Sequence, residues 1–401
     1  MTASPNNDNS SLGIYIQIPF CASKCTFCNF SSGVERTATF DRYTEMLLCE
    51  LDGCADLTAA QGIPPQVFSL PVNSIYFGGG TPALLGQERL ERLVCSLRRY
   101  FNWRKDTEFT LETTPGSADG NLLRAFREMG VNRLSIGAQT FVDQELRAVG
   151  RLHSADDTEQ LIQEAHEAGF QNISLDLIAG LPHQTRESFQ HSLEAVARLR
   201  PEHVSLYLFE VDEKSRLGRE VVHGGHRYHA GAVPGEEFMA GAYESGCAFL
   251  AGAGYAQYEI SNFALPGFES RHNRKYWRLS PYLGFGAGAH SFDGTRRWSN
   301  EISVPAYMTM LASGRSPISD FRSLTLEEQV EEFFFVGLRQ VDGVEMALAR
   351  ERWGQGCLDP WVERIQHLRR DGWVVQRGGN IRLAPQAYLI SNEIFQQFVS
   401  A

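Results

Sequence analysis

The chain contains 401 residues, of which 43% are hydrophobic, and it carries a formal net charge of -11 at pH 7. This charge disfavours nucleic acid and anionic membrane surfaces as partners, so a small ligand bound in a cleft is the better expectation. No apolar run approaches the ~20 residues that a membrane-spanning helix needs, which leaves at most peripheral contact with a membrane. Eight cysteines and no recognisable signal peptide predict a reducing, cytoplasmic location.

Short apolar runs and amphipathic stretches alternate through the first half of the chain. Residues 1–11 are polar and predict a disordered tail. The alternation that follows predicts parallel βα units, and therefore an α/β core over residues 12–213, without deciding whether the sheet closes, curls or stays open. The predicted strands span residues 14–19, 74–77, 109–112, 134–137, 173–178 and 204–209. The predicted helices span residues 40–56, 87–100, 119–129, 155–168 and 186–199.

The second half of the chain divides into two parts. Residues 214–318 have weak periodicity and form a predicted extension of the core; within it, His223, His226 and His229 predict either a metal cluster or, preferably, a solvated loop. Residues 319–401 are regular again, with predicted helices at 326–338, 360–370 and 387–398. Two short strands flank the Gly-Gly-Asn sequence at 378–380, which is a hairpin signal. This order predicts a winged-helix-like module that serves packing or partner contact.

Three cysteines follow the first predicted strand: Cys21, Cys25 and Cys28, spaced Cys-x3-Cys-x2-Cys. Thiolates are the ligands that iron–sulfur clusters and soft metals select. Three of them can hold a four-iron cluster and leave one iron open to a small molecule. A structural zinc site would normally show four ligands, a disulfide would need an oxidising compartment, and the polar residues between the cysteines argue against simple burial. The spacing therefore favours a cluster.

Distinctive residues also stand at the carboxyl ends of the other predicted strands, where barrels and open α/β sheets bind ligands. The second strand runs into a glycine-rich segment at 78–82, which allows close approach of a ligand and offers backbone N–H groups to it. Glu112 ends the third strand, Gln139 follows the fourth and Asp176 lies late in the fifth. The two carboxylates suit an ammonium group and ribose hydroxyls, although Glu112 could equally be an ordinary exposed charge.

Longer stretches of the sequence resemble the radical S-adenosylmethionine (SAM) superfamily, in its coproporphyrinogen dehydrogenase-like branch and nearest to HemW-type haem chaperones. The matches run in order from about residue 12 to the C-terminus. They include Ile18–Cys21, Phe77–Pro82, Arg133–Gln139, Gly150–His153, Asp176–Pro182 and Tyr258–Phe263. The resemblance implies a partial six-fold (β/α) barrel in the core.

The resemblance also implies the roles of single residues. Cys21, Cys25 and Cys28 would hold a [4Fe-4S] cluster whose open iron chelates the amino and carboxylate groups of SAM. A reduced cluster of this kind can pass one electron to SAM and form a 5′-deoxyadenosyl radical, and the protein then positions and shields it. The residues implied for the SAM pocket are Tyr15, Phe27, Gly79, Gly80, Thr81, Glu112, Gln139, Arg151 and Asp176.

Three features distinguish a haem-handling protein from a porphyrinogen enzyme. The related dehydrogenases carry a further cysteine where this chain has Phe30, and they have a longer N-terminal segment. The run His272–Trp277 matches the His-Asn-x-x-Tyr-Trp signature of haem-binding members of the branch. The imidazole of His272 can ligate haem iron, and Tyr276 and Trp277 can pack on the macrocycle. The alternative is a structural turn with a hydrogen-bonded histidine and two core aromatics.

These observations predict a protein that binds haem and passes it to an acceptor, with a [4Fe-4S] cluster, SAM and haem as cofactors. The resemblance suggests a respiratory haem protein as the acceptor, and a homodimer is compatible with the sequence. The competing hypothesis is a radical SAM enzyme that oxidises coproporphyrinogen III without oxygen or degrades haem anaerobically. No residue is assigned a catalytic role.

Overall fold

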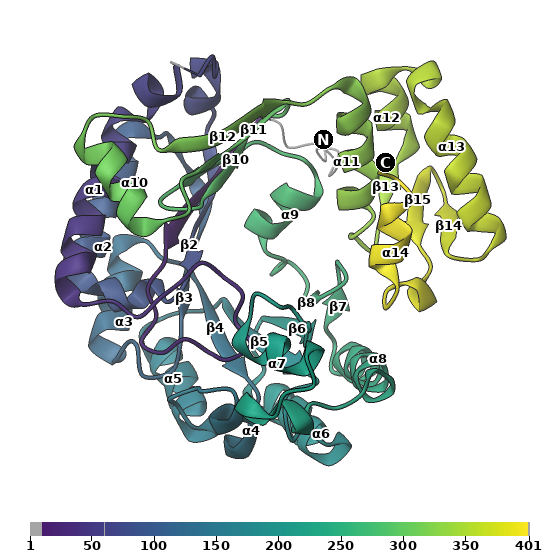
Figure 1. Cartoon of the computed structure of the whole chain (residues 1–401), viewed down its shortest axis with the longest axis horizontal. Coiled ribbons are helices and arrows are strands. Elements are labelled where there is room, and N and C mark those ends of the chain that lie inside the picture. The colour runs from purple at the N-terminus through teal and green to yellow at the C-terminus, as the bar shows by residue number, and fades with distance from the viewer. Residues whose placement is uncertain (1–9, 60, 400–401) are drawn as a thin grey trace.

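Six parallel strands form the centre of the structure, a computed structural model that describes residues 10–59 and 61–399 (Figure 1). The strands pair in chain order, from β1 to β6, and β1 and β6 are not paired with each other. The sheet is therefore a partial barrel, which confirms the predicted (β/α)6 core. The strands are β1 (Leu12–Ile18), β2 (Val72–Gly79), β3 (Trp103–Thr113), β4 (Arg133–Gln139), β5 (Ile173–Ala179) and β6 (His203–Leu208).

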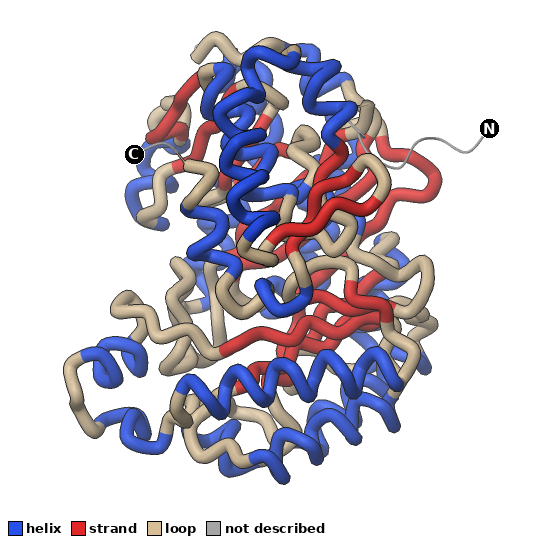
Figure 2. Tube along the Cα trace, turned by 90° about the vertical axis from the view of Figure 1, so that its right-hand side faces the viewer, coloured by secondary structure: helices blue, strands red, loops and turns tan. Residues whose placement is uncertain are grey.

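Helices connect the parallel strands and cover the outside of the barrel (Figures 1 and 2). Their apolar faces and the inner strands form one continuous core. Side-chain caps fix several helix starts: Asp119 accepts a hydrogen bond from the Leu122 backbone N–H, and Ser154 and Asp157 form a capping box. The helices are α1 (Thr37–Ala59), α2 (Gly86–Tyr100), α3 (Gly120–Met129), α4 (Asp143–Ala148), α5 (Ala155–Glu167) and α6 (Arg186–Leu199), with the 3-10 turns η1 (Pro65–Ser69) and η2 (Pro82–Leu85).

The stretch from 214 to 318 contributes strands to both edges of the core sheet, which its weak periodicity did not predict. Beyond β6 lie β8 (Asn262–Ala264) and β7 (Ala256–Gln257); beyond β1 lie β9 (Tyr282–Phe285), β10 (His290–Phe292), β11 (Arg296–Asn300) and β12 (Ile318–Ser323). These strands have two to six residues, too few for a period-two pattern to stand out. The same stretch forms α7 (Arg216–Val222), η3 (Arg227–Ala232), α8 (Glu236–Gly252), α9 (Arg271–Trp277) and α10 (Val304–Ala312).

The C-terminal module forms a second hydrophobic core beside the barrel (Figure 1). Its element order, helix–strand–helix–helix–strand–strand, is that of a winged helix, and the hairpin predicted at 378–380 joins β14 to β15. A salt bridge attaches it to the barrel, because Arg297 Nε on β11 lies 2.7 Å from Glu332 Oε1. The elements are α11 (Leu326–Gly337), β13 (Val344–Glu345), α12 (Met346–Trp353), α13 (Gln355–Arg370), β14 (Val374–Arg377), β15 (Asn380–Leu383), η4 (Pro385–Ala387) and α14 (Ser391–Gln396).

Most of the N-terminal tail predicted over residues 1–11 lies outside the described residues. Ser11, the last residue of that range, is described and is packed against the fold. Ser11 is fully buried, because Lys275 Nζ on α9 donates to its hydroxyl at 2.9 Å and to its carbonyl oxygen at 3.1 Å. Ser11 is therefore part of the packed fold. In the described part of the chain, no helix is both long and apolar enough to cross a bilayer.

A buried carboxylate joins α1 to the far edge of the sheet. Glu50 accepts hydrogen bonds from the Gly286 N–H at 2.8 Å, from Asn300 Nδ2 at 2.6 Å and from the Tyr307 hydroxyl at 2.5 Å. We expect Glu50→Ala to lower the free energy of unfolding by about 3 kcal/mol, because it leaves buried donors without an acceptor. Urea denaturation followed by circular dichroism measures this. Glu45→Ala on the exposed face of α1 is the control and should change stability by less than about 0.5 kcal/mol; equal losses would contradict the prediction.

Candidate functional site

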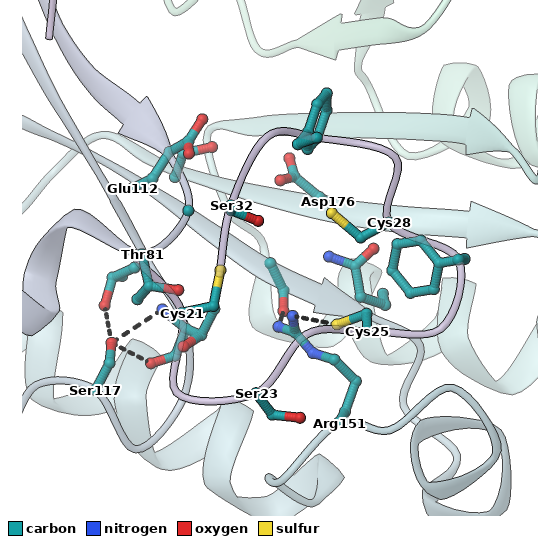
Figure 3. A pocket seen from close by; sticks show the side chains of 18 of the residues that line it. Cys21, Ser23, Cys25, Cys28, Ser32, Thr81, Glu112, Ser117, Arg151 and Asp176 are labelled. Atoms are coloured by element: carbon teal, nitrogen blue, oxygen red, sulfur yellow. Dashed lines mark hydrogen bonds between the residues drawn. The ribbon is translucent and has the colours of Figure 1, made fainter. Parts of the chain in front are cut away.

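A cavity of about 650 Å³ opens inside the barrel, on the side where β1 to β6 end. In Figure 3, the loop that carries the three cysteines runs around this cavity, and Glu112 and Asp176 lie across it. Eleven of the predicted site residues line it: Cys21, Cys25, Phe27, Cys28, Gly79, Gly80, Thr81, Glu112, Gln139, Arg151 and Asp176. Tyr15, His272, Tyr276 and Trp277 do not.

The cysteine loop is closed at its base and fixed to the barrel by its backbone. The Cys21 N–H donates to the Gly33 carbonyl, and the Gly33 N–H donates to the Pro19 carbonyl, both at 2.9 Å. Further along, the Thr26 N–H donates to the Val149 carbonyl at 3.0 Å, beside α4. The loop therefore has a defined conformation without help from the cysteine side chains.

The three thiols suit an iron–sulfur cluster better than a single metal ion. All three face one cavity, yet no group of three His, Cys, Asp or Glu side chains among residues 10–59 and 61–399 is arranged to hold one ion. In a cluster each sulfur ligates a different iron, so the sulfurs need not converge on one point. Burial raises the pKa of Cys21, and the nearby Cys28 and Cys25 raise it further. Arg151 Nη1 donates to Cys25 Sγ at 3.5 Å and brings positive charge to the thiolates.

The glycine-rich segment holds the start of the cysteine loop. A Cβ atom on Gly80 would collide with the backbone of Phe20, so this residue must be glycine for the two segments to cross. The predicted donors are already used: the Gly80 N–H bonds the Ile18 carbonyl at 2.8 Å, and the Thr81 N–H bonds the Phe20 carbonyl at 2.6 Å. The expectation that these N–H groups bind a ligand is therefore wrong, because β1 and the cysteine loop accept them. The glycine-rich segment therefore leaves space for a ligand but does not offer it the N–H groups of Gly80 and Thr81.

Glu112 and Asp176 are the acidic groups of the cavity. Glu112 accepts hydrogen bonds from the Tyr76 hydroxyl at 2.7 Å and from the Gly79 N–H at 3.1 Å, so it is not an ordinary exposed charge. Burial raises the pKa of Glu112 to about 7, and the neighbouring Asp176 adds to the rise. Burial likewise raises the pKa of Asp176 to about 6, although a hydrogen bond to Ser205 opposes it. A cationic or hydroxyl-bearing ligand would therefore stabilise the ionised form of both carboxyl groups.

Gln139 and Arg151 complete the wall above β4. Gln139 has a positive φ of 70°, which non-glycine residues rarely adopt and which often marks a functional position. Arg151 donates through Nη2 to the Gly137 carbonyl, so its guanidinium lies between that strand and Cys25. The bend at Gln139 and the anchored Arg151 place one amide and one cation beside the thiols.

The proposed haem residues, which lie on α9, do not line the cavity. His272 is 1% exposed; its Nδ1 lies 3.1 Å from Ser74 Oγ and its Nε2 2.9 Å from the Tyr276 hydroxyl. Tyr15 stacks beside the His272 ring, with centroids 6.2 Å apart. Burial lowers the pKa of His272 to about 3, and the positive charges of Lys275 and Arg133 lower it further. These contacts match the alternative interpretation, a hydrogen-bonded structural histidine.

The other histidines singled out from the sequence lie on the surface. His223, His226 and His229 are exposed, and His229 Nδ1 lies 3.0 Å from Nε2 of His183. Sequence reasoning missed several lining residues of the cavity, which include Arg133, Ser205, Tyr207 and Asn273. The period-two spacing of 133, 135, 137 and 139 was the available signal, because alternate strand residues share one face.

Comparison with known proteins now identifies the class. The Radical SAM superfamily model matches residues 15–196, and the HemN C-terminal domain model matches residues 324–390. The solved structure of coproporphyrinogen III oxidase (HemN) from Escherichia coli, titled a radical SAM enzyme, superposes with a TM-score of 0.83 at 25% identity. It covers 99% of this chain and 91% of that one. The fold and the three-cysteine cavity are those of a radical SAM protein, a class whose cofactors are a [4Fe-4S] cluster and SAM.

Curated relatives narrow the class to one family. Heme chaperone HemW from Bacillus subtilis is 36% identical over 96% of this chain and 98% of that protein. The protein of the same name from Haemophilus influenzae is 32% identical over 97% and 98%, respectively. The one from Mycobacterium tuberculosis H37Rv is 31% identical over 95% and 93%. The chain belongs to the HemW family of the radical SAM superfamily.

Proposed function

We propose that this protein is a haem chaperone, which binds haem and transfers it to an acceptor protein while carrying a SAM-chelated [4Fe-4S] cluster. The observation that carries the proposal is similarity over nearly the whole chain to proteins named heme chaperone, one of which is 36% identical and another 32% identical. The cysteine loop supports it, since the residue two positions beyond Cys28 is Phe30, whose side chain is 66% exposed on the cavity rim. An exposed aromatic ring offers a flat apolar ligand a contact surface.

We propose that Cys21, Cys25 and Cys28 hold the cluster and that the upper cavity holds SAM. The bound cluster would supply an electron to SAM. Phe27, Gly79, Gly80 and Thr81 would shape the pocket, and the carboxylates of Glu112 and Asp176 would accept hydrogen bonds from the ligand. Gln139 and Arg151 would orient it, with Tyr15 supporting the floor from below. The anchored loop and the glycine segment support this assignment, because they present the thiols and the carboxylates to one space.

Binding of SAM is expected to strengthen as pH rises from 6 to 8. The raised pKa of Glu112, about 7, makes this carboxyl mostly protonated at pH 6 and mostly ionised at pH 8. The ionised form attracts the sulfonium cation, so affinity should rise roughly tenfold over this range. Equilibrium dialysis of the cluster-loaded protein measures it. Glu112→Gln should bind more weakly and lose most of the pH dependence, and an unchanged profile in that variant would remove Glu112 from the site.

Haem transfer and porphyrinogen oxidation can be separated in one anaerobic experiment. The cluster-loaded protein is mixed first with haem and a haem-free cytochrome b, and then, in a second arm, with reductant, SAM and coproporphyrinogen III. The proposal predicts transfer of the Soret absorbance to the cytochrome and no protoporphyrinogen. Many turnovers of porphyrinogen, without haem transfer, would replace the chaperone by a radical SAM enzyme, which the structural likeness to HemN makes the second candidate.

We propose that haem contacts the segment that contains His272, Tyr276 and Trp277 only after α9 moves. Haem iron needs a free imidazole nitrogen, and both nitrogens of His272 are hydrogen-bonded. His272→Ala is therefore expected to destabilise the haem-free protein by about 2 kcal/mol, because Ser74 and Tyr276 lose a buried partner. Thermal unfolding checks this, and a haem titration then tests the ligand role. An unchanged Soret spectrum would leave His272 with a structural role alone.

We further propose a respiratory haem protein as the acceptor, met in the cytoplasm with at most peripheral membrane contact. The acidic net charge of -11 supports the last point, since it disfavours anionic lipid surfaces. A homodimer is also proposed, and analytical ultracentrifugation with and without haem tests it. A single monomeric species in both conditions would exclude the dimer.

A further inference from the structure

A buried arginine faces the lower cavity without a bonded partner. Arg133 is 1% exposed and lines the cavity, although it is the largest fully buried side chain among the described residues. Its Nε has no hydrogen-bond partner, and no hydrogen bond or salt bridge of its guanidinium is formed within the described part of the chain. The other arginine of the cavity, Arg151, donates to the Gly137 carbonyl and to Cys25. Arg133 is therefore the unsatisfied cation of the site.

Strand register places Arg133 deeper than the carboxylates. Arg133 pairs with Thr110 of β3, and the next pair on the same face is Ser135 with Glu112. Because strands rise about 3.3 Å per residue, Arg133 lies roughly 7 Å below Glu112 and roughly 20 Å below Gln139 along β4. Asn273 of α9 lines the cavity at this lower end. The backbone of Arg133 thus lies at the lower end of the cavity, far from the cysteine loop at the mouth.

The groups around Arg133 do not neutralise it at bonding distance. Glu112 and Asp176 act on it through space, since its charge lowers the pKa of both. On its other sides lie two neutral imidazoles: burial lowers the pKa of His203 well below its usual value and that of His272 to about 3. A buried charge without a partner is costly, and an anionic ligand would remove that cost.

We propose that Arg133 forms a carboxylate-binding subsite at the cavity floor, which receives a carboxylate of the ligand that fills the barrel. The planar guanidinium can bind a carboxylate through two parallel hydrogen bonds. Building on the proposed function, the carboxylate is a propionate of haem, because the carboxylate of SAM would be held by the open iron of the cluster near the cavity mouth. Asn273 would add a neutral polar contact at the same end.

The test uses the full-length, cluster-loaded protein and three variants. Arg133→Met removes the charge and keeps the bulk, Arg133→Lys keeps a charge, and Arg98→Met, on the exposed face of α2 and outside the cavity, is the matched control. Each is titrated with haem, with haem dimethyl ester, in which both propionates are esterified, and with SAM. If a propionate binds Arg133, wild type should prefer haem over the ester by roughly tenfold or more, and Arg133→Met should lose that preference while Arg133→Lys keeps part of it.

The titrations distinguish a failure of the subsite from a failure of the proposed function. Equal affinity of wild type for haem and its ester would overturn the propionate contact, whereas SAM binding is the control and should be unchanged in Arg133→Met. Unchanged binding of all three ligands in Arg133→Met would overturn the subsite. If wild type binds no haem, the proposed function and the subsite fail together, whereas haem binding without a preference over the ester overturns the subsite alone.

Stability supplies a readout that does not depend on ligands. Removing an unpaired buried charge should leave the unfolding temperature of the ligand-free Arg133→Met protein unchanged or raise it. A drop of more than roughly 4 °C would show a structural role and overturn the proposal.

Discussion

Replacing Cys21 by alanine is expected to abolish the brown absorbance of the reconstituted protein and to reduce bound iron to background. Cys21, Cys25 and Cys28 are the cysteines that face the cavity, and the chemistry calls for all three thiolates. The protein should stay folded, because backbone hydrogen bonds of Cys21 and Thr26 fix the loop and the Cys21 side chain is only partly buried. Iron and sulfide analysis with circular dichroism measures both properties.

The control for this prediction is Cys95→Ala. Cys95 is an exposed cysteine on α2, outside the cavity, so its removal should leave iron content unchanged. A cluster that survives Cys21→Ala intact would show that the ligand set is misassigned, whereas loss of iron in both variants would indicate nonspecific instability.

Gly80→Ala is expected to be as damaging to the cluster as the loss of a cysteine, although residue 80 carries no ligand atom. The added Cβ would overlap the O, C and N atoms of Phe20, and backbone cannot rotate away as a side chain can. Phe20 is itself fixed, since it is fully buried and stacked on Phe40 with ring centroids 4.3 Å apart. The start of the cysteine loop must therefore move, together with Cys21.

We expect Gly80→Ala to cost about 3 kcal/mol of stability and to lower iron occupancy severely. Gly120→Ala is the matched control: residue 120 is the first of α3, and a Cβ there meets nothing closer than 3.7 Å. That variant should be neutral or slightly stabilised. Full iron occupancy and normal stability in Gly80→Ala would show that the two segments can separate without consequence for the cluster.

The parts of the fold that follow a strong local pattern could be predicted from the sequence. The helix at 186–199 was predicted to the residue, because an amphipathic period lies between clear start and stop signals. The edge strands β7 to β12 could not be predicted, since each is short and is defined by the neighbour that it pairs with rather than by its own residues. The same distinction holds for the site: positions set by local pattern were predictable, and those set by distant partners were not.

The location of Glu112 and Asp176 in the cavity was predictable, because the carboxyl ends of parallel strands lie together at one end of a barrel. Whether a donor or an imidazole is free to bind was not predictable. The N–H of Gly80 and the ring of His272 are both engaged by residues distant in sequence, Ile18 and Ser74 respectively. A sequence motif does not show which distant residues will form hydrogen bonds with its members.

The pairing of β1 with β9 has a consequence for how the chain folds during synthesis. β1 comprises residues 12–18, yet its second neighbour, β9, begins at Tyr282, so one edge of the first strand stays open while some 260 residues are added. At about 5–20 residues per second, translation leaves that edge exposed for roughly 13 to 52 s. An uncovered apolar strand edge invites pairing with other nascent chains. The interval is thus a window in which ribosome-bound chaperones would protect this protein, and slow translation would favour its aggregation.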